Sequence, residues 1–190
     1  MPRIDSKSEH GEPAWVDDVI HFWFEELAES HWFSTSEAID ARIRDRFLKL
    51  HERLMANAAP GAGVPRSLLA AVIVLDQFSR NLFRGSPRAY SADPIARRLS
   101  RTAIDQGVDI VMKKTERYFL YLPFEHSEDK EDQVLALHLI KHLGNDDWTR
   151  IAVEHMATID RFGRFPHRNA VLNRASSADE IAFLEARGSP

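Results

Sequence analysis

Apolar side chains recur every three or four positions in one segment of this chain after another, and that spacing places them on one face of an α-helix. Within 14–29, for example, the apolar stripe consists of Trp15, Val19, Phe22, Trp23 and Leu27. Every strong periodic signal in the sequence is of this helical kind. The sequence therefore predicts an all-α fold.

Residues that start and stop helices divide the chain into segments of about 10–20 residues. Ser36, Asp93 and Ser127 stand at expected helix starts, Ser177 begins a capping box, and Pro123 is expected to break a helix. Glycines at 107, 144 and 163 follow expected helix ends. The expected helices cover about 14–29, 36–58, 67–78, 93–106, 115–123, 127–142, 146–162 and 177–187.

The segment 67–78, SLLAAVIVLDQF, follows the helix-breaking PGAGVP at 60–65. Its apolar run has the composition of a buried strand or of a helix that is apolar on all sides. The two alanines, the absence of alternation and the absence of partner strands favour the helix. We therefore expect a central helix that its neighbours surround.

Eight or nine helices joined by short loops favour antiparallel neighbours. The predicted fold is an antiparallel stack of these helices, and the alternation of helix pairs also permits a solenoid. Residues 1–13 are polar, with proline and glycine, and are expected to form a flexible arm. We predict a single helical domain over 14–190.

Composition limits the chemistry. The absence of cysteine excludes disulfides, thiolate zinc sites and cysteine nucleophiles, and suits a reducing cytoplasm. No apolar run approaches the roughly 20 residues that span a bilayer. The 19 arginines outnumber the 6 lysines while the net charge is −4. This balance argues against nucleic-acid binding and indicates internal ion-pair networks or recognition of an anion.

Three segments concentrate polar residues beside apolar runs. In 75–88, Asp76, Arg80 and Arg84 recur every four residues, and Gln77 and Asn81 form a parallel pair. An i,i+4 ion pair and arginines near a helix C-terminus explain the charged residues as stabilising elements. The neutral amides need partners if they are buried. All five residues are candidate ligand-binding residues.

The second segment, 116–132, sets aromatic residues beside Arg117, His126, Glu128 and Asp129. Acids near a helix start stabilise the helix without any further role. His126 could be a base, a metal ligand or simply a hydrogen-bonded loop residue, and both His126 and Glu128 are candidate catalytic residues. The His-x-Glu-Asp spacing is a weak metal signal, so we predict no metal and no cofactor.

The third segment, RFGRFPHRNAVLNR at 161–174, holds four arginines and no acid. One interpretation is that these arginines pair with the acidic run 125–132. The other is that some of them face an anionic ligand. We expect Arg164 to donate to the carbonyls of the helix that Gly163 ends, and Arg168 to be the better ligand candidate. Further candidates are His167, also a candidate catalyst, and Asn169, whereas His155 is interpreted as a satisfied core histidine.

LDQFSRNLFRG, FLYLPFEHSED and RFGRFPHRN, in this order, closely resemble a bacterial family catalogued as domain of unknown function 924. The resemblance also includes Trp32-Phe33 with the residues Asp40, Ile43, Arg46 and Phe47, and it extends over nearly the whole chain after residue 14. It implies an all-α fold similar to tetratricopeptide-repeat proteins, and it implies no activity. Family members often have proline where this chain has Ser79.

Two functions follow as hypotheses. The first is a binding module whose Arg/His/Asn-lined pocket or groove holds an anionic small molecule or a peptide carboxylate. The alternative is a metal-independent hydrolase or transferase that acts on an anionic small molecule, with histidine as acid and base. The sequence contains no nucleophile elbow, phosphate loop or metal box, and it leaves open whether the protein is an enzyme. We expect the three polar segments to meet in one site.

Overall fold

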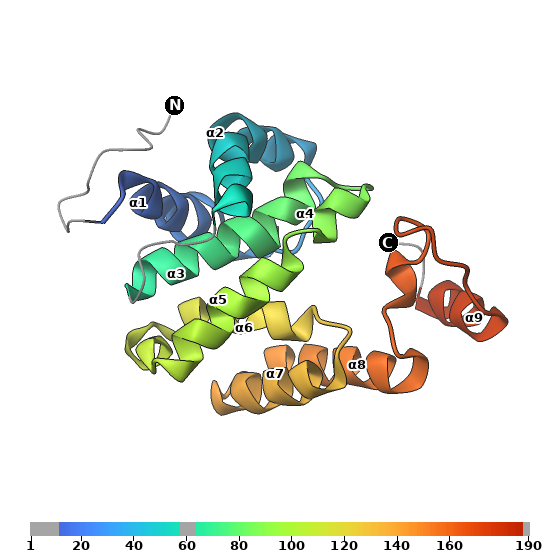
Figure 1. The fold of residues 1–190 in the computed structure, drawn as a ribbon. Coiled ribbons are helices and arrows are strands. Elements are labelled where there is room, and N and C mark those ends of the chain that lie inside the picture. The colour runs from blue at the N-terminus through green and yellow to red at the C-terminus, as the bar shows by residue number, and fades with distance from the viewer. Residues whose placement is uncertain (1–11, 58–63, 188–190) are drawn as a thin grey trace. The chain divides into compact units, whose positions relative to one another are not determined.

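The computed structural model describes residues 12–57 and 64–187, and within them it is helical and contains no strand (Figure 1). This confirms the all-α prediction. Two compact units divide the chain. The first comprises residues up to 84 together with 88–123, and the second comprises 85–87 together with the residues from 124 onward. The single domain over 14–190 stays a prediction. Most of the expected flexible arm, residues 1–11, lies outside the described residues.

The first unit contains most of the helices. Its elements in chain order are α1 (Ala14–His21), η1 (Phe22–Glu26), η2 (Glu29–His31), α2 (Glu37–Ala56), α3 (Pro65–Val72), η3 (Ile73–Phe78), α4 (Ser79–Leu82), η4 (Pro87–Tyr90), α5 (Asp93–Asp105), η5 (Val108–Val111) and α6 (Lys114–Glu125). Two of these, η4 and α6, extend across the division between the units. The Ser36 hydroxyl accepts the Ile39 N–H and caps α2, as the sequence predicted.

The central element of the first unit is the apolar segment that follows Pro65. Helices α3, η3 and α4 run on without a break from Pro65 to Leu82, and residues 68–75 are at most 2% exposed. Helices α1, α2 and α5 pack against this length of chain (Figure 1). The prediction of a surrounded central helix is confirmed.

Two stretches of π-helix, η1 and η3, lie in the core of this unit. They contact each other through Phe78, whose ring centroid lies 5.8 Å from that of Phe22 and 5.6 Å from that of Trp23. The sequence did not indicate them, because one added residue per turn leaves the apolar composition unchanged. The first helix ends at Glu26, earlier than predicted, because Leu27 is extended.

Three further predicted helix boundaries are wrong. Helix α6 continues through Pro123 to Glu125. Its aromatic side chains are almost fully buried, and burial of each contributes about 1.5–3 kcal/mol to the stability of the fold. This gain offsets the roughly 3 kcal/mol that a proline inside a helix costs. Asp93 is the first residue of α5 and not its cap, because its carboxylate binds Arg80. Asp129, in place of Ser127, caps the helix that follows.

The second unit contains α7 (Lys130–His142), α8 (Asp146–Phe162), η6 (Pro166–Arg168) and α9 (Ala178–Arg187). Helices α7 and α8 pack side by side as a hairpin that turns at Gly144 (Figure 1). Gly163, with φ of 68°, ends α8. In the predicted capping box of α9, the Ser177 hydroxyl accepts the Glu180 N–H and the Glu180 carboxylate accepts the Ser177 N–H. None of the helices in the described ranges has the length and apolarity to span a bilayer.

Candidate functional site

The residues predicted from segment 75–88 that belong to the first unit are engaged with neighbouring acids. Both terminal nitrogens of Arg80 bind the Asp93 carboxylate, and one of them also donates to the Ala89 carbonyl at 2.8 Å. Asp76 is fully buried 3.4 Å from Arg80, and it accepts a 2.6 Å hydrogen bond from Gln77. This arrangement is a closed polar network around the end of the central helix.

Asn81 and Arg84 converge on Asp40, which belongs to α2. Asn81 donates to its carboxylate at 2.8 Å, and Arg84 forms a fork with bonds of 2.9 and 3.0 Å. Burial acts to raise the pKa of Asp40, but the hydrogen bonds from Arg84 and Asn81 outweigh burial and lower that pKa. These contacts join two helices, and a ligand would have to compete with them.

Arg117 is also engaged within the first unit. Its Nε donates to the Tyr121 hydroxyl at 3.1 Å, and its terminal nitrogen lies 3.9 Å from Asp109. The Tyr121 hydroxyl donates to Asp109 at 2.5 Å. Burial and this bond to Asp109 raise the pKa of Tyr121 to about 12, so the phenol keeps its proton at neutral pH.

In the second unit, Glu128 holds the arginine-rich segment in place. Its carboxylate accepts the Phe165 N–H at 2.8 Å and forms a fork with Arg174 at 2.7 and 3.0 Å. Burial acts to raise the pKa of Glu128, but the bonds from Arg174 and Phe165 lower it. The hypothesis that the acidic run pairs with this segment holds for Arg174.

Arg164 pairs with Glu180, and its partners differ from those predicted. The guanidinium donates to the carboxylate at 2.7 and 2.8 Å and to the Ala175 carbonyl at 2.8 Å, in place of the α8 carbonyls. This fork and the Ser177 N–H lower the pKa of Glu180 to about 2. Asn169 is buried and donates to the Ser176 hydroxyl at 3.1 Å.

Histidines gather around Phe165. His155 Nδ1 lies 3.4 Å from the buried carboxylate of Glu125, and the His155 ring packs 5.3 Å from that of Phe165. Although His167 is exposed as a whole residue, desolvation of its ring, the Arg168 charge and the nearby His155 and His126 lower its pKa to about 4.

The surroundings of these histidines revise the sequence-based interpretation. The Arg168 guanidinium lies over the Phe165 ring at 4.7 Å and is 7% exposed. The His155 side chain is 30% exposed, so it is not a core residue, but its Nδ1 is satisfied by the Ile151 carbonyl at 3.0 Å and also faces Glu125 of the acidic run. The described residues contain no group of three metal-ligating side chains.

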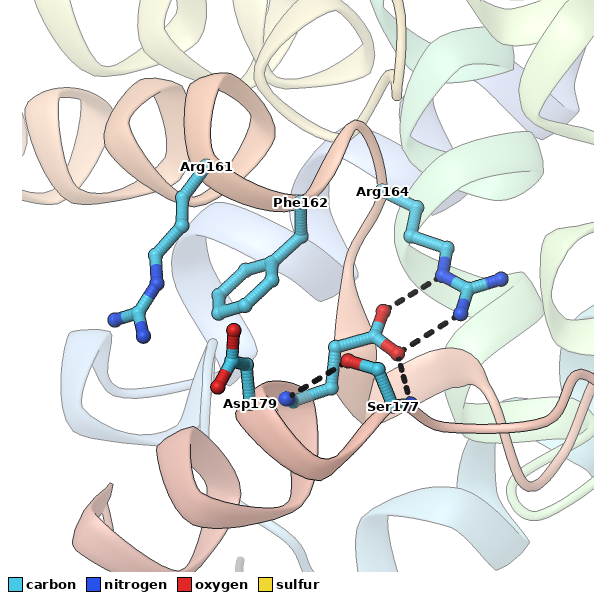
Figure 2. A pocket seen from close by; sticks show the side chains of 6 residues that line it. Arg161, Phe162, Arg164, Ser177 and Asp179 are labelled. Atoms are coloured by element: carbon cyan, nitrogen blue, oxygen red, sulfur yellow. Dashed lines mark hydrogen bonds and ion pairs between the residues drawn. The ribbon is translucent and has the colours of Figure 1, made fainter.

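A pocket of about 390 Å³ opens where α8 ends and α9 begins (Figure 2). The pocket is lined by Arg161, Phe162, Arg164, Ser177, Asp179 and Glu180. The Arg161 guanidinium lies 4.7 Å from the centre of the Phe162 ring and 5.9 Å from that of Phe183. In the view of Figure 2, Arg161 lies to one side of the Phe162 ring and Arg164 to the other.

The charged residues of the pocket differ in their engagement. Arg164 and Glu180 neutralise each other. Arg161 and Asp179 are both exposed, and neither makes a hydrogen bond or ion pair with any residue in the part of the chain that the structure describes. Of the residues that line the pocket, only Arg164 was predicted as a site residue. Arg161 was not, although it opens the arginine-rich segment, and neither were Phe162, Ser177, Asp179 and Glu180.

The three predicted segments are distributed over the two units. Residues 75–84 belong to the first unit and 161–169 to the second, while 116–129 crosses the division. Arg80, Arg84 and Arg164 are each paired with an acid of their own unit, whereas Arg161 makes no hydrogen bond or ion pair to a described residue. Their convergence on one site stays a prediction, and so does ligand binding by the candidate residues.

Comparisons with known proteins identify relatives but no activity. The bacterial protein family of unknown function DUF924 matches residues 19–188. A solved structure of a protein of unknown function, ATU0120 from Agrobacterium tumefaciens, is similar with a TM-score of 0.87 and 37% sequence identity. The match covers 91% of this chain and 98% of the other. No protein with a curated description matches the chain.

Proposed function

We propose that this chain, which belongs to the bacterial family of unknown function DUF924, is a binding protein that holds the carboxylate of a small molecule or peptide end. The pocket between α8 and α9 is the proposed site. The observation that carries the proposal is Arg161, which lines this pocket and has no hydrogen bond or ion pair to a described residue. Its guanidinium offers a carboxylate two parallel hydrogen bonds.

The aromatic surroundings of Arg161 favour this role. The guanidinium lies against Phe162 and near Phe183, and the centres of these two rings are 5.0 Å apart. A cation held over aromatic rings keeps its N–H groups at the edge of the plane, where a ligand can accept them. Because this contact limits the motion of the side chain, less conformational entropy is lost on binding.

A structural role competes with this proposal. Arg161 lies in the last turn of α8. A cation at this position interacts favourably with the helix dipole and stabilises the helix by about 0.3–1 kcal/mol. That contribution needs no ligand. The two roles differ in one measurable respect, because only the binding role makes the apparent stability of the protein depend on added carboxylates.

The histidines of the second unit favour a second candidate function, a metal-independent hydrolase or transferase for an anionic small molecule. The buried carboxylate of Glu125 lies 3.4 Å from Nδ1 of His155, as a carboxylate beside a catalytic imidazole would, although Nδ1 donates its hydrogen bond to the Ile151 carbonyl at 3.0 Å. The low pKa of His167, about 4, keeps this ring neutral but makes it a weak base at neutral pH. We therefore rank catalysis below binding.

The cellular and architectural parts of the proposal rest on the sequence. The cysteine-free composition supports a cytoplasmic location. The family resemblance supports a likeness to tetratricopeptide-repeat proteins, whose stacked helices suit ligand binding. A thermal-shift screen of carboxylates and phosphates tests the binding role, with Arg161→Gln as the site variant and Arg150→Gln as the control. Arg150 is an exposed arginine of α8 whose partners, Asp147 and Glu154, lie on the same helix.

A further inference from the structure

We infer that the ligand of the α8–α9 pocket is a zwitterion, a free α-amino acid whose carboxylate binds Arg161 and whose ammonium group binds Asp179. This inference rests on the proposed function, in which Arg161 binds a carboxylate, and it adds a positive charge on the ligand that Asp179 binds. Asp179 lines the same pocket, is exposed, and has no hydrogen bond or ion pair to a described residue. Figure 2 shows its carboxylate beneath the Phe162 ring, on the side of the ring where Arg161 lies.

The charges in the pocket select for a ligand with both signs. Once the fork between Arg164 and Glu180 is set aside, one cation and one anion remain. A simple carboxylate or phosphate would satisfy Arg161 but place its charge near Asp179. A ligand that also carries an ammonium group satisfies both residues, so like-charge repulsion makes plain anions and plain cations bind more weakly.

The N-terminus of α9 offers no substitute for this second contact. Its capping box is closed, because the Ser177 N–H donates to Glu180 at 2.7 Å and the Glu180 N–H donates to the Ser177 hydroxyl at 3.2 Å. These donors are therefore engaged before a ligand arrives. A dianion such as phosphate would meet two acids, Asp179 and Glu180, at this helix end.

The size and walls of the pocket suit an amino acid. A volume of about 390 Å³ is at the small end of the range for ligand sites, about 300–1,000 Å³. The Phe162 ring supplies an apolar wall beside the charged groups. Ligand side chains that are apolar or aromatic should therefore bind better than charged ones.

The competing explanation is that Arg161 and Asp179 approach each other in solution and close the pocket. An exposed ion pair contributes little to stability because solvent and salt screen it. A zwitterion would separate such a pair, because its carboxylate would take the place of Asp179 beside Arg161 and its ammonium group would take the place of Arg161 beside Asp179. In that case Asp179→Asn would free Arg161 and increase the affinity for plain carboxylates.

Isothermal titration calorimetry distinguishes these possibilities. The probes are the twenty free amino acids and, for each that binds, its N-acetyl derivative and its amide, which keep only the negative or only the positive charge. We expect at least one apolar amino acid to bind at least tenfold more tightly than both derivatives. Asp179→Asn should reduce its affinity to that of the N-acetyl form. Asp160→Asn, an exposed acid of α8 that faces Lys130, is the control and should change nothing.

Each remaining outcome contradicts a specific step. If N-acetyl derivatives bind as tightly as the free amino acids, or if Asp179→Asn leaves amino-acid affinity unchanged, the zwitterion inference is wrong while the carboxylate site stands. If none of the twenty amino acids binds, the inference is also wrong. If Arg161→Gln leaves all binding intact, the proposed function itself fails.

Discussion

Arg164 and Glu180 bind each other through two parallel hydrogen bonds, from Nε to Oε1 at 2.7 Å and from the terminal nitrogen to Oε2 at 2.8 Å. The same carboxylate accepts the N–H of Ser177. This pair ties the end of α8 to the start of α9 and forms one wall of the pocket (Figure 2). Arg164 therefore shapes the site, and Arg161 is the cation that a ligand can reach.

Arg164→Ala should lower the melting temperature at neutral pH, because Glu180 would lose its main partner. The stabilisation should depend on pH. Since the folded pKa of Glu180 is lowered from 4.5 to about 2, its contribution is complete above pH 4.5 and is lost as the pH falls through about 2. Thermal unfolding from pH 7 to pH 2 should show the difference between wild type and Arg164→Ala shrinking toward zero. A difference that stays constant with pH would contradict this account of the pair.

Ser79→Ala should destabilise the protein by about 1–3 kcal/mol. The Ser79 hydroxyl donates to the Leu75 carbonyl at 2.6 Å and lies 2.8 Å from Nε2 of His51. Because its own proton goes to Leu75, the hydroxyl accepts from the His51 ring, which is 2% exposed. Without the hydroxyl, this ring N–H is left buried with no acceptor.

A double-mutant cycle in urea unfolding checks this contact. The cost of Ser79→Ala should fall to below about 0.5 kcal/mol when His51 is replaced by Phe. Equal costs in both backgrounds would show that Ser79 acts only through Leu75.

His51 should make the protein sensitive to mild acid. Burial and the nearby Arg88 charge lower its pKa from 6.5 to about 4. The unfolded chain therefore takes up the proton first, and stability is lost as the pH falls from 6.5 toward 4. The contribution is about 3 kcal/mol for a shift of this size. His51→Gln should remove that much of the decline in unfolding free energy.

Glu128→Ala should cost about 1.5–3 kcal/mol, because the charged hydrogen bonds to Arg174 and Phe165 are lost. Glu128→Gln keeps an oxygen for the Phe165 N–H and should cost less. Chemical unfolding with urea measures both variants. If Glu128→Ala stays within about 0.5 kcal/mol of wild type, Glu128 does not hold this segment, and its candidate catalytic role gains weight.

Local sequence patterns determine much of this fold. The apolar run 67–78 indicated the central helix, and the spacing of Ser177 and Glu180 indicated the α9 cap, because each depends on near neighbours in the chain. The π-helical turns could not be predicted, because one added residue per turn leaves the apolar composition unchanged, and Phe22, Trp23 and Phe78 meet only through tertiary packing. Proline at 123 was misjudged because burial of the flanking aromatic residues outweighs the local cost.

The site was harder to predict because it also depends on contacts between residues that are far apart in the sequence. Segment 75–88 revealed its polar residues, but Asp40, which binds Arg84, lies 44 positions away. The arginine-rich segment drew attention to Arg164 and Arg168, whereas the pocket also depends on where α9 places Asp179. Tertiary contacts decide which arginines are paired with acids. Residue type and spacing in the sequence do not show this pairing.

The central claim is that Arg161 binds a carboxylate, and the most direct test is a carboxylate-dependent shift in melting temperature measured on four proteins. These are wild type, Arg161→Gln, Arg168→Ala and Arg150→Gln, each with a panel of amino acids, monocarboxylates and phosphate at fixed ionic strength. The account predicts that a carboxylate raises the melting temperature of wild type, Arg168→Ala and Arg150→Gln, and that Arg161→Gln alone loses the response. A response that survives in Arg161→Gln but disappears in Arg168→Ala would contradict the claim and place the ligand beside Phe165.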